Sequence, residues 1–193
     1  MRMFFDTSEF EFTATLEANW LLIRQELEQL QQCHFVPWPE KFLYENTWEV
    51  FGLYHIGTKL KDNCRLCPNT TRLVEMIPGI TTAGFSSLAP GTHIKPHVGY
   101  SKAVLRCHLG LIVPDKCMLR VGNQTRNWQE GKCLIFDDTI EHEAWNCSEK
   151  IRTILLIDVK KPKAMLNRQF QQSFSVDLAR FIRDLTNFSV EVF

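Results

Sequence analysis

This chain has no excess of positive or of negative charge, and it has no long apolar run. The 22 lysines and arginines balance the 22 aspartates and glutamates among 193 residues, so the formal net charge is zero. Without a basic stripe, we expect no nucleic-acid partner. No stretch approaches the roughly 18 apolar residues that a membrane-spanning helix requires, so we expect no transmembrane segment. The opening MRMFFDTSEFEF also lacks an apolar signal core, which predicts no secretory signal.

The chain has seven cysteines, and because this number is odd we expect no complete set of disulfides. Cys107, Cys133 and Cys147 lie in apolar segments, which predicts small buried residues. Cys64 and Cys67 form a CxxC motif, but no second CxxC and no histidine at ligand spacing accompany it. We therefore favour a plain loop there over a disulfide or a zinc site, and we expect a reducing, cytoplasmic location.

What the chain does have is a globular composition rich in large aromatic residues. Hydrophobic residues make up 45% of the sequence and charged residues 23%, both usual values for a globular protein. The 14 phenylalanines and 5 tryptophans predict a bulky aromatic core. No repeat or linker divides the sequence, so we expect a single domain over residues 1–193.

Two amphipathic segments flank the middle of the chain and predict helices. Apolar residues recur at three- and four-residue steps through residues 8–32, which predicts one helix there. The same reasoning predicts a C-terminal helix at about residues 163–188. Residues 61–71 are polar and contain Asn, Pro and Thr, which predicts a loop.

The segment between these helices has the period of β-strands. Apolar and polar residues alternate, most clearly over residues 102–113, and turn signals recur about every ten residues. From Leu73 onward the pattern predicts strands throughout. We expect a mainly β fold with flanking helices, in which antiparallel strands over about residues 45–162 form a sandwich or a barrel.

Two histidines and an arginine carry the functional interpretation. His97 and His142 each lie in a strand-like segment, and Arg152 follows ten residues after the second. Two neutral imidazoles in one barrel can hold a ferrous ion, and an arginine can hold a dicarboxylate by a two-point fork. Taken singly, His97 is better explained as a turn residue, and His142 as a surface or hydrogen-bonded histidine, than as a metal ligand. A facial iron triad usually has a carboxylate two residues after the first histidine, where this chain has Gly99.

Further polar residues in the same segments suggest a lined cavity. Arg106 and His108 are two residues apart, so they face the same side of their strand. The alternative is an exposed polar face that also includes Lys102. Asp137 and Asp138 are candidates for capping a turn or orienting an imidazole. Trp128, in RNWQEGK with Gly131, indicates a hairpin turn.

Four segments together resemble the aspartyl/asparaginyl β-hydroxylase family: SSLAPGTHIKPHVG, LRCHLGLIVP, RVGNQTRNWQEGKCLIFDDTIEHEAWN and RTILLIDVKKP. The resemblance extends over roughly residues 10–162, and LEANWLLIRQEL is similar to the helix that precedes the family's core. It implies a double-stranded β-helix, that is, a cupin-like jelly roll. It also implies an oxygenase that uses Fe(II), 2-oxoglutarate and O2 to hydroxylate an unactivated C–H bond, releasing succinate and CO2.

The resemblance also implies a set of site residues. His97 and His142 match the iron ligands. The residues that match the 2-oxoglutarate site are Ser86, Arg106, His108 and Arg152.

The resemblance also bears on the substrate and the reaction at two further positions, Gly99 and Val104, which we assign to the substrate pocket. The animal aspartyl hydroxylases also have glycine at the position of Gly99, whereas at the position of Val104 they have an arginine that grips the acidic substrate. The expected substrate is a small molecule, a peptide or an acyl chain. Aspartyl or asparaginyl hydroxylation is the named activity. Lipid acyl-chain hydroxylation, halogenation and a non-catalytic cupin-like binding protein are the alternatives.

Overall fold

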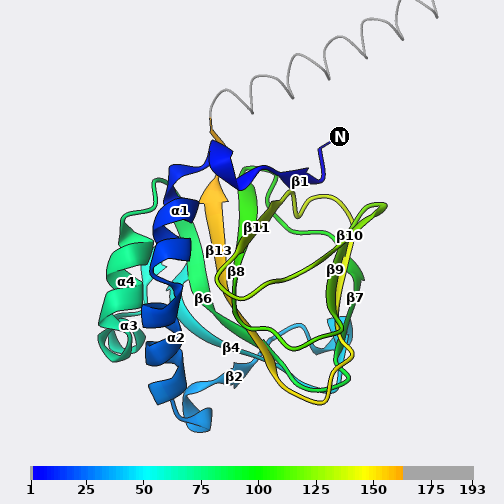
Figure 1. Ribbon diagram of the computed structural model, residues 1–193, viewed down its shortest axis with the longest axis horizontal. Coiled ribbons are helices and arrows are strands. Elements are labelled where there is room, and N and C mark those ends of the chain that lie inside the picture. The colour runs from blue at the N-terminus through cyan, green and yellow to red at the C-terminus, as the bar shows by residue number, and fades with distance from the viewer. Residues whose placement is uncertain (1, 163–193) are drawn as a thin grey trace, which may run out of the picture. The chain divides into compact units, whose positions relative to one another are not determined.

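Two antiparallel sheets face each other in the computed structural model, which describes residues 2–162 (Figure 1). The larger sheet has eight strands in the order β1-β11-β8-β13-β6-β4-β2, with β5 paired to β4. Its strands are β1 (Phe4–Phe5), β2 (Val36–Pro37), β4 (Trp48–His55), β5 (Thr58–Lys59), β6 (Ile80–Leu88), β8 (Val104–Ile112), β11 (Cys133–Phe136) and β13 (Arg152–Lys160).

The smaller sheet has five strands in the order β10-β9-β12-β7-β3. Its strands are β3 (Tyr44–Glu45), β7 (His93–His97), β9 (Cys117–Val121), β10 (Gln124–Asn127) and β12 (His142–Asn146). Two facing antiparallel sheets with strands alternating between them form a jelly roll, so the predicted fold class is confirmed.

Helices cover the face of the larger sheet that points away from the smaller one (Figure 1). They are α1 (Glu11–Ala18), α2 (Trp20–Gln29), α3 (Lys61–Leu66) and α4 (Pro68–Glu75). The short 3₁₀ turns are η1 (Thr7–Glu9), η2 (Gln32–His34) and η3 (Lys41–Leu43), of which η3 packs against the smaller sheet. Within residues 2–162, no helix combines the length and the apolar character needed to cross a membrane.

The single helix expected over residues 8–32 is wrong in its continuity. Asn19 separates α1 from α2, because its backbone N–H donates to the Leu16 carbonyl and its side-chain amide donates to the Thr15 carbonyl. Side chains of this kind compete with helical hydrogen bonds. The apolar stripe is still the buried face, as expected, since Leu16, Ile23 and Leu27 are all buried.

The loop expected over residues 61–71 is also wrong, since α3 and α4 occupy this segment. Pro68 takes the first position of α4, where its missing N–H costs nothing. The next amides, those of Asn69 and Thr70, each donate to the Glu26 carboxylate of α2 at 2.8 Å. This cap comes from a residue more than forty positions away, so no local pattern reveals it.

Five other expectations are checked, corrected or left open. The CxxC cysteines are both buried free thiols at the junction of α3 and α4, and burial raises the pKa of Cys67 to about 12. Cys147 is exposed just after β12, not buried, whereas Cys107 and Cys133 are buried as expected. The pattern is not β throughout from Leu73, because α4 continues to Glu75. The expected helix at about 163–188 lies outside the described residues, and the single domain stays a prediction.

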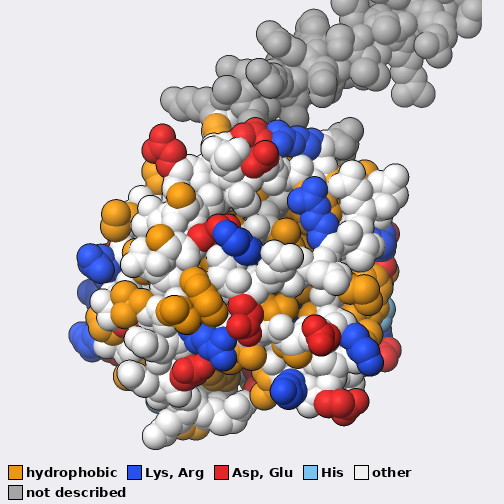
Figure 2. Space-filling view, in the orientation of Figure 1, with side chains coloured by type: hydrophobic (Ala, Val, Ile, Leu, Met, Phe, Trp, Pro, Cys, Tyr) orange, Lys and Arg blue, Asp and Glu red, His pale blue; other side chains and the backbone are white. Residues whose placement is uncertain are grey.

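The core between the two sheets holds the cavity described below. The buried apolar side chains that form this core are Phe4, Trp48, Leu88, Ile94, Cys117, Leu119, Val121, Trp128, Phe136, Ala144, Ile154 and Leu156. On the outer face shown in Figure 2, acidic and basic side chains are interspersed and neither sign gathers into a patch.

Candidate active site

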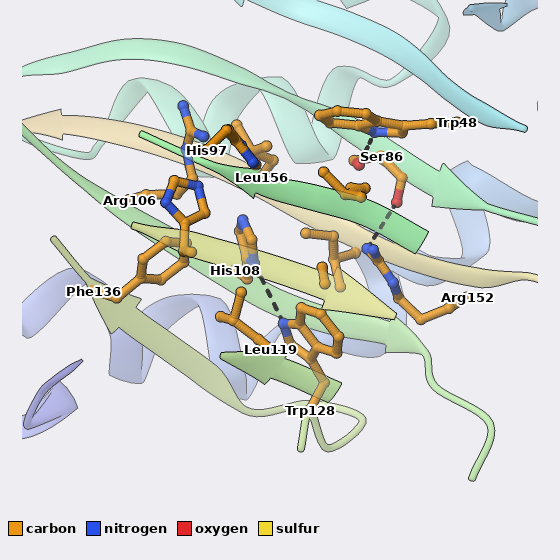
Figure 3. Close-up of a pocket in the computed structure, with 14 residues that line it drawn as sticks. Trp48, Ser86, His97, Arg106, His108, Leu119, Trp128, Phe136, Arg152 and Leu156 are labelled. Carbon is orange, nitrogen blue, oxygen red and sulfur yellow. Dashed lines mark hydrogen bonds between the residues drawn. The ribbon is translucent and has the colours of Figure 1, made fainter. Parts of the chain in front are cut away.

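One cavity between the sheets collects the polar residues that the sequence singles out (Figure 3). It holds about 370 Å³ of space, counting the part open to solvent. Six of its lining residues are those matched to metal and co-substrate binding: Ser86, His97, Arg106, His108, His142 and Arg152. The others are apolar or aromatic: Trp48, Ile94, Leu119, Trp128, Phe136, Ala144, Ile154 and Leu156.

Strand pairing brings the two histidines together. His97 ends β7 and His142 begins β12, and the register of these neighbouring strands sets the two residues opposite each other. Their ring centroids are 4.2 Å apart, with the ring planes tilted by 51°. Phe136 of the facing sheet packs edge-on against His142, with centroids 5.4 Å apart. Residues 45 positions apart in the chain thus form one histidine pair.

Each histidine of the pair is held in the same tautomer. Nδ1 of His97 bonds the Lys95 carbonyl at 2.8 Å, and Nδ1 of His142 bonds the Ile140 carbonyl at 2.9 Å. A carbonyl can only accept, so Nδ1 carries the proton in both rings. Nε2 of each ring is then left with its lone pair, which is the form that binds a metal.

The surroundings also keep this histidine pair neutral. Burial lowers the pKa of His97. Burial, and next the neighbouring His97, lower the pKa of His142 to about 3. Both rings are therefore uncharged at neutral pH and available as ligands.

Arg152 is a buried cation without an internal anion. Its side chain is 1% exposed, and Nη1 donates only a long bond of 3.4 Å to the Ser86 carbonyl. Its Nε has no hydrogen-bond partner, and no carboxylate within residues 2–162 pairs with it. Burial lowers its pKa to about 10, so the group remains charged at neutral pH. Buried charges are normally paired, so this arrangement fits a site for an anion.

Arg106 lines the same cavity but is already paired. Its Nε and Nη2 donate to the two oxygens of Asp158 at 2.8 and 3.0 Å, and Nη2 lies 3.3 Å from Asp138 Oδ2. Burial alone would lower the pKa of Arg106, but Asp158 and then Asp138 raise it. The structure places Arg106 and His108 on the cavity, not on an exposed face, yet the guanidinium fork of Arg106 is occupied by Asp158.

His108 has a donor directed to no protein group. The indole N–H of Trp128 donates to its Nδ1 at 3.3 Å, so the proton of neutral His108 is on Nε2. That Nε2 is buried and has no partner in the described part of the chain. Burial, and next Arg106, hold the pKa of His108 well below its usual value. The cavity thus contains an unpartnered neutral donor as well as the free cation Arg152.

Two tryptophans complete the site, and the sequence did not indicate either of them. The hairpin turn expected at Trp128 is wrong. Trp128 follows β10, is buried, and lines the cavity. Its ring lies against Arg152, with 4.6 Å from the guanidinium carbon to the ring centroid. Trp48 Nε1 donates to Ser86 Oγ at 3.0 Å, which leaves the serine O–H free to donate to a ligand. A buried indole N–H requires an acceptor, but the sequence does not reveal which one.

Gly99 and Val104, the two residues matched to the substrate pocket, do not line the cavity. A Cβ added to Gly99 would lie 2.1 Å from Asp138 Oδ2, and the Gly99 N–H donates to the Asp138 carbonyl at 2.6 Å. Val104 is buried at the start of β8 opposite Lys160, beyond the Arg106–Asp158 pair. Of the two aspartates expected to cap or orient, Asp137 accepts from the N–H and hydroxyl of Thr139.

The fold and the cavity define a jelly-roll protein with two histidines and a free arginine in its core. The family description for aspartyl/asparaginyl β-hydroxylase matches residues 17–162, and the chain belongs to this family. A solved oxidoreductase of the 2OG-Fe(II) oxygenase family from Burkholderia pseudomallei shares the fold, with a TM-score of 0.54. The two are 10% identical, and the match covers 77% of this chain and 89% of the other.

Two curated relatives differ in the substrate that their names state. The ornithine lipid ester-linked acyl 2-hydroxylase of Rhizobium tropici is 45% identical over 169 residues, covering 82% of this chain and 60% of the relative. The human aspartyl/asparaginyl beta-hydroxylase is 37% identical over 167 residues, covering 82% of this chain and 22% of the relative. The chain therefore spans less than two thirds of the length of the first relative and less than a quarter of the length of the second.

Proposed function

We propose that this chain is an Fe(II)- and 2-oxoglutarate-dependent dioxygenase that hydroxylates an unactivated C–H bond, with release of succinate and CO2. The observation that carries the proposal is the free cation Arg152 in the same cavity as two neutral histidines with open Nε2 atoms. A dicarboxylate and a divalent metal are the ligands that these two features fit.

His97 and His142 would hold the metal through their Nε2 atoms. The described residues contain no group of three or more His, Cys, Asp or Glu side chains placed to bind one ion, so two protein ligands are the whole set proposed here. Bound Fe(II) supplies the chemistry that couples oxidation of 2-oxoglutarate by O2 to oxidation of the substrate. The protein contributes position and a cavity walled by apolar side chains.

Arg152 would bind the distal carboxylate of 2-oxoglutarate through a two-point fork, assisted by the Ser86 hydroxyl. The Trp128 ring holds the guanidinium group from one side, which restricts its direction. The buried Nε2–H of His108 offers a donor to another oxygen of the co-substrate. Arg106 also lines this site, but because Asp158 already fills its fork, we assign it a supporting role and not the two-point carboxylate contact.

For the substrate, the charges in the cavity favour an acyl chain over an aspartyl side chain. Within residues 2–162, Arg106 and Arg152 are the cations that line the cavity. The first is paired with Asp158, and the second is assigned to the co-substrate. A substrate carboxylate would therefore be buried without a partner, at a cost of several kcal/mol. The 45% identity to an acyl 2-hydroxylase agrees with this preference.

Hydroxylation is favoured over halogenation by the group beside Gly99. The Asp138 carboxylate stands where a side chain at position 99 would begin. A negative group there disfavours a neighbouring halide and is compatible with water. A purely binding role without chemistry does not account for the paired, metal-competent histidines.

The experiment is substrate-dependent succinate formation by the purified chain with Fe(II), 2-oxoglutarate and O2. The panel contains an ester-linked acyl aminolipid, a free fatty acid, and matched peptides with Asp, Asn or Leu. We expect turnover with the acyl lipid, and a hydroxylated acyl product by mass spectrometry. Turnover with the Asp peptide alone would assign the aspartyl activity instead. An anaerobic mixture with Fe(II) and 2-oxoglutarate that shows no charge-transfer band would contradict the proposed cofactors.

A further inference from the structure

Three large apolar side chains are exposed beside the cavity, and we call Phe42, Val98 and Tyr100 the apolar rim. Their side chains are 72%, 56% and 88% exposed. Val98 directly follows His97, which lines the cavity, and Tyr100 is three residues after His97. Phe42 belongs to η3, which packs against β7, the strand that ends at His97. All three residues therefore lie next to the end of β7 that carries the histidine.

Contacts connect this rim to the cavity wall. The Tyr100 hydroxyl and the Trp38 indole N–H both donate to the carboxylate of Glu40. The ring of Trp38 stacks on Trp48, with 4.3 Å between centroids and 7° between planes. Trp48 in turn lines the cavity and bonds Ser86. The rim is therefore supported by the same wall that lines the cavity.

The charged groups beside the rim favour an anionic partner. Lys41 precedes Phe42 and Lys102 follows Tyr100 by two residues, and both are exposed. Neither lysine forms an ion pair with any residue in the part of the chain that the structure describes. Glu40, which accepts hydrogen bonds from Tyr100 and Trp38, offsets one of these charges, so the two lysines leave a net positive charge beside the rim. Exposed aromatic side chains flanked by free lysines are typical of surfaces that bind at a lipid interface.

We propose that the apolar rim docks on an anionic lipid bilayer, with Phe42, Val98 and Tyr100 in the interface and Lys41 and Lys102 on the headgroups. Docking of this kind presents the cavity to the lipid acyl chains. The inference rests on the proposed acyl-lipid activity and adds how the substrate is reached. Burial of several apolar side chains together with attraction of lysines for anionic lipid is enough for reversible binding.

The test is co-sedimentation of the full chain with vesicles of phosphatidylcholine, with and without phosphatidylglycerol. We expect binding that increases with phosphatidylglycerol and weakens with salt. The double variant Phe42→Ser/Tyr100→Ser should bind at least tenfold more weakly. Lys41→Gln/Lys102→Gln should lose the preference for phosphatidylglycerol. The matched control is Leu21→Ser, which removes a 58% exposed side chain from α2, on the helix-covered side of the larger sheet.

Several results would overturn the proposal. These are no vesicle binding by the unmodified chain, equal binding by the Phe42→Ser/Tyr100→Ser variant, or an equal loss in Leu21→Ser. A change in sedimentation coefficient caused by the rim variant, without vesicle binding, would assign the rim to contact between copies of the chain. Succinate formation with a water-soluble short-chain acyl ester separates the two proposals. Vesicle binding without any acyl turnover contradicts the proposed function alone, and soluble turnover without vesicle binding contradicts the docking alone.

Discussion

Trp128 lies under the guanidinium group of Arg152, with 4.6 Å between the guanidinium carbon and the ring centroid. The same indole donates its N–H to His108, so one side chain contacts both the free cation and the unpartnered donor of the cavity (Figure 3). Trp128 therefore sets the direction of one group and the tautomer of the other. This makes it a positioning residue for the proposed co-substrate.

The first prediction separates the two roles of Trp128. Trp128→Phe keeps a ring near Arg152 but removes the hydrogen bond to His108, which is worth about 0.5–1.5 kcal/mol. We expect the apparent KM for 2-oxoglutarate to rise by up to roughly tenfold, with little change in the affinity for Fe(II). Trp128→Leu, which removes both contacts, should raise the KM further. Equal KM values for Trp128→Phe and the unmodified chain would show that the hydrogen bond has no part in binding.

A second prediction concerns the cation itself. Arg152→Ala should weaken binding of 2-oxoglutarate by about 2–5 kcal/mol, which is roughly thirtyfold or more. Arg152→Lys should recover only part of this loss, because an ammonium group cannot form the two-point fork. Isothermal titration with 2-oxoglutarate under anaerobic conditions measures the change.

The matched control for Arg152 is Arg126→Lys. Arg126 also lies over an aromatic ring, 4.3 Å from the centroid of Phe4, but it is exposed and outside the cavity. Its replacement should leave 2-oxoglutarate binding unchanged. If the Arg152 variants bind the co-substrate as well as the Arg126 variant, then the carboxylate site lies elsewhere.

The third prediction concerns the metal. His97→Ala or His142→Ala should abolish Fe(II) binding, because a set of two protein ligands cannot lose one and remain a site. Equilibrium dialysis with Fe(II) measures the loss, and circular dichroism checks that the fold is kept. His93→Gln is the control on the same strand, since His93 bonds Glu143 at 2.9 Å and does not line the cavity. Full Fe(II) occupancy in either alanine variant would refute the assignment.

The sequence could predict six of the residues that line the cavity because they lie in long ordered segments; their roles stay predictions. Strand alternation places Arg106 and His108 on one face, and the family resemblance relates His97, His142 and Arg152. It could not predict which charges are already paired. Arg106 contacts Asp158 because β8 and β13 are neighbouring strands whose register sets these two residues opposite each other. The local sequence of either strand does not reveal that pairing.

Two of the missed features, the burial of Trp128 and the helix α4, share this cause, since each depends on a partner distant in the sequence. The sequence pattern predicted a turn at Trp128 because Gly131 follows it. Its buried position instead depends on the acceptor His108, twenty residues earlier. The sequence pattern predicted a loop in place of α4, because the residue that caps this helix, Glu26, lies on another helix. Such side-chain bonds satisfy polar groups only after the chain has folded, so composition and periodicity do not contain them.

A fourth prediction follows from the contact between Gly99 and Asp138. Gly99→Ala places a Cβ 2.1 Å from Asp138 Oδ2, so the carboxylate or the backbone must move. We expect a loss of about 1–3 kcal/mol in the free energy of unfolding, measured with urea. Gly99→Asp should be at least as unfavourable, so the glycine at this position is required by packing.

The double variant Gly99→Ala/Asp138→Ala tests the cause. Removing the Asp138 carboxylate makes room for the new methyl group, so the double variant should lose less stability than the two single losses added together. Arg106 keeps Asp158 as a partner in this background. Strict additivity of the two single losses would show that the Gly99 substitution acts through something other than Asp138.

The last prediction concerns pH and the buried histidine His108. Its pKa in the folded chain lies well below the ordinary value of 6.5, chiefly because of burial, so the unfolded chain binds more protons below pH 6.5. Metal-free protein should therefore lose stability as the pH falls from 7 to 5, and this one group contributes up to about 1.4 kcal/mol per pH unit below 6.5. His108→Gln keeps an acceptor for the Trp128 N–H but does not titrate, so its urea midpoint should fall less over the same interval. An identical pH dependence in the variant and the unmodified chain would mean that folding does not lower the pKa of His108.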